Sequence, residues 1–164
     1  MSVYLGIDLG GTKIAAIALA ESGETLAECR VETPAGNYDG TLMAIQSLVA
    51  KIEVETWRTG SVGIGIPGSI SARTGLVRNA NSVCLIGKPL GRDLSGLLDR
   101  QIRITNDANC FTLSEAVDGA AMDDRSVFGV ILGTGVGGGF ALDRRVQDGA
   151  NGIAGEWGHN SLPW

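Results

Sequence analysis

Asp107 is the side chain in this sequence best suited to accept a proton from a substrate. It follows the alternating apolar segment from Ile102 to Thr105 and, with Asn106, stands where a helix running to about Val117 is expected to begin. A carboxylate placed there can act as a general base for a hydroxyl group, which typically contributes ~10²–10⁴-fold to a rate. The amide of Asn106 can hydrogen-bond the same substrate. The alternative is that one of the two residues only caps the helix, because Asn and Asp are common N-caps.

A glycine turn early in the chain has the groups needed to hold a phosphate. Asp8 to Lys13 reads DLGGTK, which combines bare backbone N–H groups with a hydroxyl and with a carboxylate able to organise Mg²⁺ at a polyphosphate. The motif is not a Walker A loop, because the GK[ST] order is absent. A tight hairpin without a ligand is the simpler alternative.

A second glycine cluster runs from Gly133 to Gly139 and reads GTGVGGG. It contains the G-x-G-x-x-G pattern of dinucleotide-binding Rossmann turns, but such a turn requires a helix directly afterwards. The cluster instead leads into Phe140 to Leu142 and an expected turn at Asp143-Arg144, a sequence that suits a hairpin. Phosphate binding by a hairpin is therefore favoured over dinucleotide binding.

Two further stretches carry groups able to bind hydroxyls. Asn79 and Asn81 can offer paired amides to adjacent hydroxyl groups, or can belong to an ordinary polar loop. The stretch GIAGEWGH, from Gly152 to His159, combines the only histidine of the chain with Glu156. One histidine cannot by itself form a metal site, which needs several protein ligands.

These residues lie at the ends of elements that the apolar pattern predicts. Three strands form a meander opened by the first glycine turn, and an amphipathic helix with Asp39 or Asn37 as its N-cap follows. A strand stopped by Pro67-Gly68 precedes a polar loop and a short helix. This order predicts an α/β domain whose ligands bind beyond the carboxyl ends of the strands. The predicted strands are Val3–Leu9, Lys13–Leu19, Thr25–Thr33, Ser61–Ile66, Ile102–Thr105 and one from Val127, the loop is Ser69–Asn81, and the helices are Asp39–Glu55, Asp93–Arg100 and one ending near Val117.

The composition excludes several classes of protein. With 164 residues, 44% hydrophobic and 19% charged, the chain has the balance of a folded globular protein. The net charge of −5 and the scattered Lys and Arg residues argue against nucleic acid as a partner. No apolar run approaches the ~20 residues of a membrane helix, so we expect no membrane partner and a cytoplasmic location. The three widely spaced cysteines are expected to be reduced thiols.

A pattern that occurs twice in the sequence predicts a second domain. Ile7 to Thr12 and Ile131 to Gly135 both place a glycine-threonine turn directly after an apolar strand. We expect a first domain at 1–124 and, at 125–164, the start of a second domain that is too short to close a sheet with covering helices. The chain is therefore expected to be a fragment.

Six motifs occur together and in order: DLGGTK, GIGIPGSI, NANS, NDAN, GTGVGGG and AGEWGH. As a set they resemble the ROK (repressor, open reading frame, kinase) family of the hexokinase, actin and Hsp70 superfold, and the resemblance covers essentially the whole chain. It implies an actin/hexokinase-like (ribonuclease H-like) α/β domain, with a mixed sheet flanked by helices, followed by the opening hairpin of a second such domain. It also implies a homodimer.

The resemblance implies an ATP-dependent kinase that transfers the terminal phosphoryl group of ATP to a primary hydroxyl of a hexose, with Mg²⁺ as cofactor. Asp107 would be its catalytic base. Family members also hold a structural Zn²⁺ through the counterpart of His159 and a CxCGxxGCxE segment, which is absent here, so we expect zinc to bind weakly or not at all. The residues implied to bind sugar are Asn81, Asn106, Glu156 and His159, and those implied to hold the ATP phosphates and Mg²⁺ are Asp8, Gly10, Gly11, Thr12, Lys13, Gly133, Thr134 and Gly135.

The stretch from Glu156 to Trp164 is similar to bacterial fructokinases, also called manno(fructo)kinases, so conversion of fructose to fructose 6-phosphate is the expected reaction. N-acetylglucosamine or glucose kinases of the same family are the alternative, since Gly133 to Gly139 suits them equally. A sugar-responsive ROK repressor would carry a helix-turn-helix ahead of the kinase-like part, and DLGGTK, which begins at residue 8, leaves no room for one. A non-catalytic sugar-binding module is the remaining alternative, and we expect little or no turnover from the 164-residue chain alone.

Overall fold

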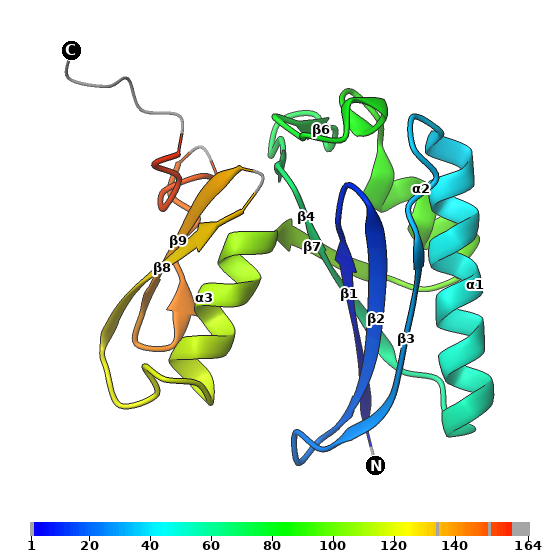
Figure 1. The fold of residues 1–164 in the computed structure, drawn as a ribbon, viewed down its shortest axis with the longest axis horizontal. Helices are drawn as coiled ribbons and strands as arrows, with labels where there is room; N and C mark the ends of the chain where they lie inside the picture. The colour runs from blue at the N-terminus through cyan, green and yellow to red at the C-terminus, as the bar shows by residue number, and fades with distance from the viewer. Residues whose placement is uncertain (1, 134, 151, 159–164) are drawn as a thin grey trace. The chain divides into compact units, whose positions relative to one another are not determined.

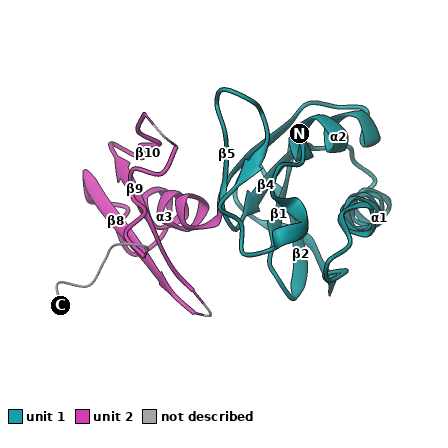
Figure 2. Cartoon of the chain, turned by 90° about the horizontal axis from the view of Figure 1, so that it is seen from above, with its two compact units in different colours: residues 1–105 teal, residues 106–164 magenta. Residues whose placement is uncertain are grey.

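Two compact units make up the chain in the computed structural model, residues 1–105 and residues 106–164 (Figure 2). The structure describes residues 2–133, 135–150 and 152–158. Each unit contains its own sheet and is described by itself. Within the described residues, no helix combines the length and the apolar character needed to cross a bilayer.

Unit 1 is built on a five-stranded sheet in the order β3-β2-β1-β4-β7 (Figure 1). The first three strands form the predicted antiparallel meander, and β4 lies parallel to β1 on its other side. Because β1 and β4 are parallel, the turns that follow their carboxyl ends lie at the same edge of the sheet. The strands are β1 (Val3–Leu9), β2 (Lys13–Ala20), β3 (Thr25–Glu32), β4 (Ser61–Ile66) and β7 (Ile102–Asn106).

Helix α1 (Tyr38–Thr56) packs along β2 and β3. Of the two predicted caps, Asn37 is the one used, because its Oδ1 accepts a hydrogen bond from the Gly40 N–H at 2.9 Å. The helix ends at Thr56, and the cap residue Trp57 that follows has a left-handed backbone with φ 55°. Its buried positions recur at helical spacing, and the apolar ones belong to the core of unit 1: Thr41, Ile45, Leu48, Val49 and Ile52.

Helix α2 (Leu90–Leu97) begins earlier than the predicted Asp93 and ends before the predicted Arg100. The reason is burial: Leu90 and Leu94, one turn apart, are completely buried and hold the first turn against the core. Asp93 therefore lies inside the first turn of the helix. Its carboxylate accepts a hydrogen bond from the Tyr38 hydroxyl at 2.9 Å and so links α2 to the start of α1.

The segment predicted as a loop from Ser69 to Asn81 contains a short pair of strands, β5 (Ser69–Ile70) and β6 (Val77–Arg78). The single-turn 3₁₀ helix η1 (Val83–Leu85) follows. Two-residue strands were not detectable as a period-2 pattern, because they span too few positions. The pairing folds this segment back on itself beside the end of β4.

Unit 2 packs helix α3 (Asp107–Val117) against a sheet in the order β10-β9-β8. Ala116, Val127 and Ala141 form its small core. The compact units thus divide before α3, whereas the domains predicted from the sequence, 1–124 and 125–164, divide after it; the domain boundary stays a prediction. The strands are β8 (Ser126–Leu132), β9 (Val136–Leu142) and β10 (Arg145–Val146), and the predicted turn at Asp143-Arg144, with φ 49° and 59°, joins the last two.

Candidate functional site

The turn from Gly10 to Thr12 joins β1 to β2 at the sheet edge where β1 and β4 end. The Gly10 N–H donates to the carbonyl oxygen of Lys13 at 3.0 Å, which closes the predicted hairpin. A Cβ at position 10 would lie 2.8 Å from that oxygen, so the turn requires glycine there. Gly11 and Thr12 are exposed, and their N–H groups donate to no other described residue. Exposed N–H groups on a tight turn can bind an anion.

Asp8 is the carboxylate next to this turn. Its neighbours Ile7 and Leu9 are buried, and alternation along β1 places Asp8 on the opposite face of the sheet. The residue as a whole is exposed, yet partial burial of its carboxyl group raises the pKa above its ordinary value. A carboxylate oxygen is a ligand that Mg²⁺ prefers. Lys13, at the start of β2, is also exposed.

Asp8→Asn is expected to raise the stability of the fold near neutral pH. A carboxyl group whose pKa is raised on folding destabilises the folded state when it is ionised. This penalty is complete above the folded pKa and disappears as the pH falls below the unfolded pKa. Urea midpoints of the two proteins, measured from about pH 3 to about pH 7, should therefore converge at the acidic end. Glu21→Gln, in the exposed turn after β2, controls for the loss of a surface charge, and equal midpoints for Asp8→Asn and the parent at neutral pH would contradict the prediction.

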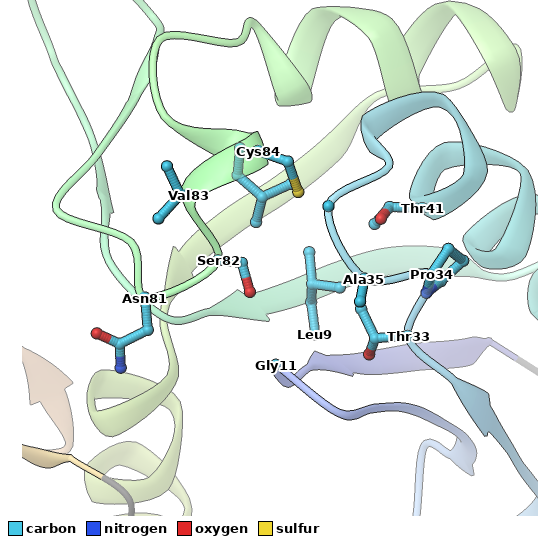
Figure 3. A pocket seen from close by; sticks show the side chains of 12 residues that line it. Leu9, Gly11, Thr33, Pro34, Ala35, Thr41, Asn81, Ser82, Val83 and Cys84 are labelled. Carbon is cyan, nitrogen blue, oxygen red and sulfur yellow. The ribbon is translucent and has the colours of Figure 1, made fainter.

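A cavity of about 320 Å³ opens beside the glycine turn (Figure 3). The hydroxyl of Ser82 points into the cavity, while the amide of Asn81 points away from it. Gly11, which is predicted to contact phosphate, and Asn81, which is predicted to contact sugar, both line the cavity. Its volume is in the range of small-molecule pockets. The lining residues are Leu9, Gly11, Thr33, Pro34, Ala35, Gly36, Thr41, Asn81, Ser82, Val83, Cys84 and Leu85.

Gly68, directly after β4, brings two predicted motifs into contact. Its φ is 120°, and a Cβ there would lie 2.7 Å from the Arg78 carbonyl oxygen and 2.9 Å from the Ala80 Cα. The backbone of the NANS motif therefore packs directly on the Pro67-Gly68 turn. Asn79 adopts the left-handed backbone, with φ 54°, that Asn tolerates better than most residues. Asn81 thus lies near the edge of the sheet where β1 and β4 end.

Asn106 and Asp107 open helix α3, as predicted. Asn106 is the N-cap, because its Oδ1 accepts a hydrogen bond from the Asn109 N–H at 3.2 Å. Asn106 therefore caps the helix through its Oδ1, and its predicted contact with sugar stays a prediction. Asp107 is the first residue of the helix itself; its Oδ1 accepts from the Ala108 N–H at 2.9 Å, and the residue is half-buried. The helix N-terminus is an electrostatically favourable place for this carboxylate.

The second glycine cluster divides between a turn and a strand. Gly133 and Gly135 lie in the β8–β9 turn, where the Gly133 N–H donates to the Gly135 carbonyl oxygen at 2.9 Å. Thr134 lies outside the described residues. The next three glycines, 137–139, lie inside β9. The glycines lead into a strand and not a helix, so the predicted hairpin is confirmed and the Rossmann alternative is excluded.

The segment around Glu156 packs closely against the backbone of β9. A Cβ on Gly155 would lie 2.5 Å from the Gly139 Cα, and one on Gly138 would lie 2.6 Å from the Trp157 Cδ1. Glu156 is half-buried, and its Oε1 accepts from the Gly158 N–H at 2.9 Å. His159 lies outside the described residues. Among those that are described, no three His, Cys, Asp or Glu residues cluster closely enough to hold a metal ion.

Asn109 is a residue of this region that the sequence reasoning missed. Its side chain is buried on the first turn of α3, and its Nδ2 donates to the Asp148 Oδ1 at 3.3 Å. It therefore ties the start of α3, where Asp107 lies, to the segment after β10. The available signal was its position three residues after the cap Asn106, where side chains at a helix start commonly reach neighbouring groups.

A model of the ROK family matches residues 4–163, nearly the whole chain. The chain therefore belongs to the ROK family. Curated relatives include the N-acetyl-D-glucosamine kinase of Vibrio parahaemolyticus, which is 46% identical over 161 residues, or 98% of this chain and 53% of the relative. The N-acetyl-D-glucosamine kinase of Escherichia coli O6:H1 is 48% identical over 162 residues, with the same two shares. The chain spans about half the length of these relatives.

Solved structures of ROK proteins superpose closely on the chain. The ROK hexokinase from Thermus thermophilus has a TM-score of 0.85 at 33% identity, covering 98% of this chain and 53% of that one. The ROK family glucokinase from Streptomyces griseus, in complex with glucose and AMPPNP, has a TM-score of 0.89 at 31% identity, covering 98% and 51%. The predicted actin/hexokinase-like α/β fold is confirmed. The predicted fructokinase subtype is not, since the named curated relatives are N-acetylglucosamine kinases.

Proposed function

We propose that this chain is part of an ATP-dependent kinase that phosphorylates N-acetylglucosamine. The observation that carries the proposal is the 46–48% identity to N-acetyl-D-glucosamine kinases across 98% of the chain. The exposed N–H groups of the Gly10–Thr12 turn support it, because a kinase must hold the phosphates of its nucleotide. N-acetylglucosamine thus replaces fructose as the proposed substrate, and glucose is the second candidate.

The first glycine turn would bind the phosphates of ATP. Gly10 and Gly11 leave no side chain between the backbone and the nucleotide, and the Gly11 and Thr12 N–H groups are exposed. Asp8 would hold Mg²⁺, which when bound would neutralise charge on the phosphates. Lys13 would add a positive charge beside the turn, and the second glycine turn, with Gly133, Thr134 and Gly135, would also take part in holding the phosphates.

Asp107 would act as the general base. The sugar hydroxyl oxygen forms a bond to the terminal phosphorus of ATP as the bond from that phosphorus to ADP breaks, and Asp107 accepts the hydroxyl proton. The hydrogen bond from the Ala108 N–H orients the carboxylate. The remaining sugar hydroxyls would be bound by Asn81, Asn106, Glu156 and His159. The homodimer, the cytoplasmic location and the weak binding of zinc at His159 stay predictions.

Two chimaeric proteins test the substrate. In one, this chain replaces the matching half of the Vibrio parahaemolyticus N-acetyl-D-glucosamine kinase; in the other, it replaces the matching half of the Streptomyces griseus glucokinase. ADP release would be measured with N-acetylglucosamine, glucose, mannose and fructose. We expect kcat/KM to be highest for N-acetylglucosamine in both chimaeras, roughly tenfold or more above fructose, because a site built for a polar substituent discriminates against sugars that lack it.

The parent enzymes are the matched controls, and they separate the contribution of this chain from that of its new second half. A preference for fructose in both chimaeras would restore the fructokinase assignment. Folded chimaeras that are inactive with all four sugars, beside active parents, would overturn the kinase proposal.

A further inference from the structure

Thr33 forms hydrogen bonds with the first glycine turn at the residues before and after Gly11. It follows β3, and its Oγ1 donates a hydrogen bond to the carbonyl oxygen of Gly10 at 2.8 Å. Its backbone N–H donates to the carbonyl oxygen of Thr12 at 2.9 Å. One residue therefore holds the carbonyl groups that flank Gly11 on either side. None of the six sequence motifs includes Thr33.

The bond to Gly10 sets the direction of the Gly11 N–H. The carbonyl of Gly10 and the N–H of Gly11 belong to one planar trans peptide unit, in which they point in opposite directions. When Thr33 draws the Gly10 carbonyl toward itself, the Gly11 N–H must point away from Thr33. That N–H donates to no other described residue, so the hydrogen bond leaves it directed outward and available to a ligand.

A peptide between two glycines needs such an external constraint. Neither Gly10 nor Gly11 has a Cβ, so the Gly10–Gly11 peptide unit is limited less by its own sterics than any other in the turn. Without the Thr33 hydroxyl, this peptide could rotate and turn its N–H away from the anion. The same absence of side chains that opens the turn to a phosphate makes its N–H direction dependent on a neighbour.

Thr33 is itself held firmly. Pro34 follows it and restricts the residue before proline to extended backbone, and the branched Cβ of threonine limits its rotamers. The Pro34 carbonyl oxygen accepts from the Asn37 N–H at 3.1 Å, and Asn37 caps α1. The Thr33 hydroxyl thus connects the turn to the start of a long helix packed on the same sheet.

We propose that Thr33 is a positioning residue for phosphate recognition: its hydroxyl orients the Gly10–Gly11 peptide so that the Gly11 N–H is preset as a donor to a phosphoryl oxygen of the nucleotide. The proposal rests on the phosphate-binding role proposed for this turn. It assigns to Thr33 no contact with the nucleotide itself.

The test follows the Gly11 amide by NMR in the 164-residue chain during titration with MgATP and, separately, with inorganic triphosphate. In the parent chain we expect a downfield shift of the Gly11 N–H. Thr33→Val keeps the size and branching of the side chain and the backbone bond to Thr12 but removes the hydroxyl. It is expected to weaken triphosphate binding roughly tenfold and to reduce the Gly11 shift, because a preoriented donor to an anion is lost. Thr33→Ser, which restores the hydroxyl, should bind within about twofold of the parent.

Different results would contradict the phosphate-binding role of the turn and the positioning role of Thr33. A Gly11 amide that does not respond to either ligand in the parent chain would overturn the phosphate role of the turn. A parent response that Thr33→Val reproduces with the same affinity and the same Gly11 shift would overturn the role of Thr33 alone. If Thr33→Val does not fold, Thr33→Ala provides the same comparison, with Thr33→Ser again as the rescue.

Discussion

Asp107→Asn is expected to lower kcat by ~10²–10⁴-fold in either chimaera and to leave the affinity for sugar within about twofold. The asparagine side chain has nearly the same shape, and its amide oxygen can still accept the hydrogen bond that the Ala108 N–H gives to Asp107. It cannot accept the proton of a substrate hydroxyl. Steady-state assays of ADP release, together with calorimetric titration of the sugar, separate the loss of the chemical step from a loss of binding.

Asp118→Asn is the matched control for this substitution. Asp118 lies at the other end of α3, is exposed, and has no role in the proposed chemistry. Its replacement removes the same charge from the same helix and should leave kcat unchanged. Normal turnover in Asp107→Asn would eliminate Asp107 as the base, whereas equal losses in both variants would show that the loss is not specific to the position of Asp107.

The meander and the first helix were predictable because burial and periodicity agree there. In β1, Val3, Leu5, Ile7 and Leu9 alternate with exposed or half-buried residues, and the strand has the bounds that this alternation predicts. Helix α2 was misplaced for the opposite reason. Asp93 is a good cap by type, but the burial of Leu90 and Leu94 starts the helix before it, and local propensity does not report such tertiary contacts.

In the candidate site, too, the features set by local sequence could be predicted and those set by tertiary contacts could not. The motif residues of the first turn and of the start of α3 were readable, since glycine, Asn and Asp have specific backbone and capping roles. The role of Thr33 could not be predicted, because it depends on contacts with a turn more than 20 residues away in the sequence, such as the hydrogen bond to Gly10. The substrate proposed here differs from the predicted fructose because the prediction used only the short stretch from Glu156 to Trp164, whereas the identity to an N-acetyl-D-glucosamine kinase extends over 98% of the chain.

Gly139→Ala is expected to lower the free energy of unfolding of unit 2 by about 1–3 kcal/mol. The Cβ of an alanine at 139 would lie 2.7 Å from the Ala108 carbonyl oxygen on α3 and would overlap the Thr112 Oγ1. Thr112 cannot easily move aside, because it is completely buried and its hydroxyl donates to that same carbonyl at 2.7 Å. Helix α3 must then move away from β9. Hydrogen exchange of the β8 and β9 amides measures the stability of this unit separately from unit 1.

Gly137→Ala is the matched control for Gly139→Ala, because residues 137 and 139 lie on the same face of β9 and both face α3. A Cβ at 137 would have its nearest neighbour, the Ala108 Cβ, at 3.5 Å, an ordinary packing distance. Its effect should therefore be within about 0.5 kcal/mol. Equal destabilisation by both substitutions would show that glycine in this strand matters for backbone flexibility. A difference confined to Gly139 would show that part of the GTGVGGG cluster serves to seat α3, and with it Asp107, against the sheet.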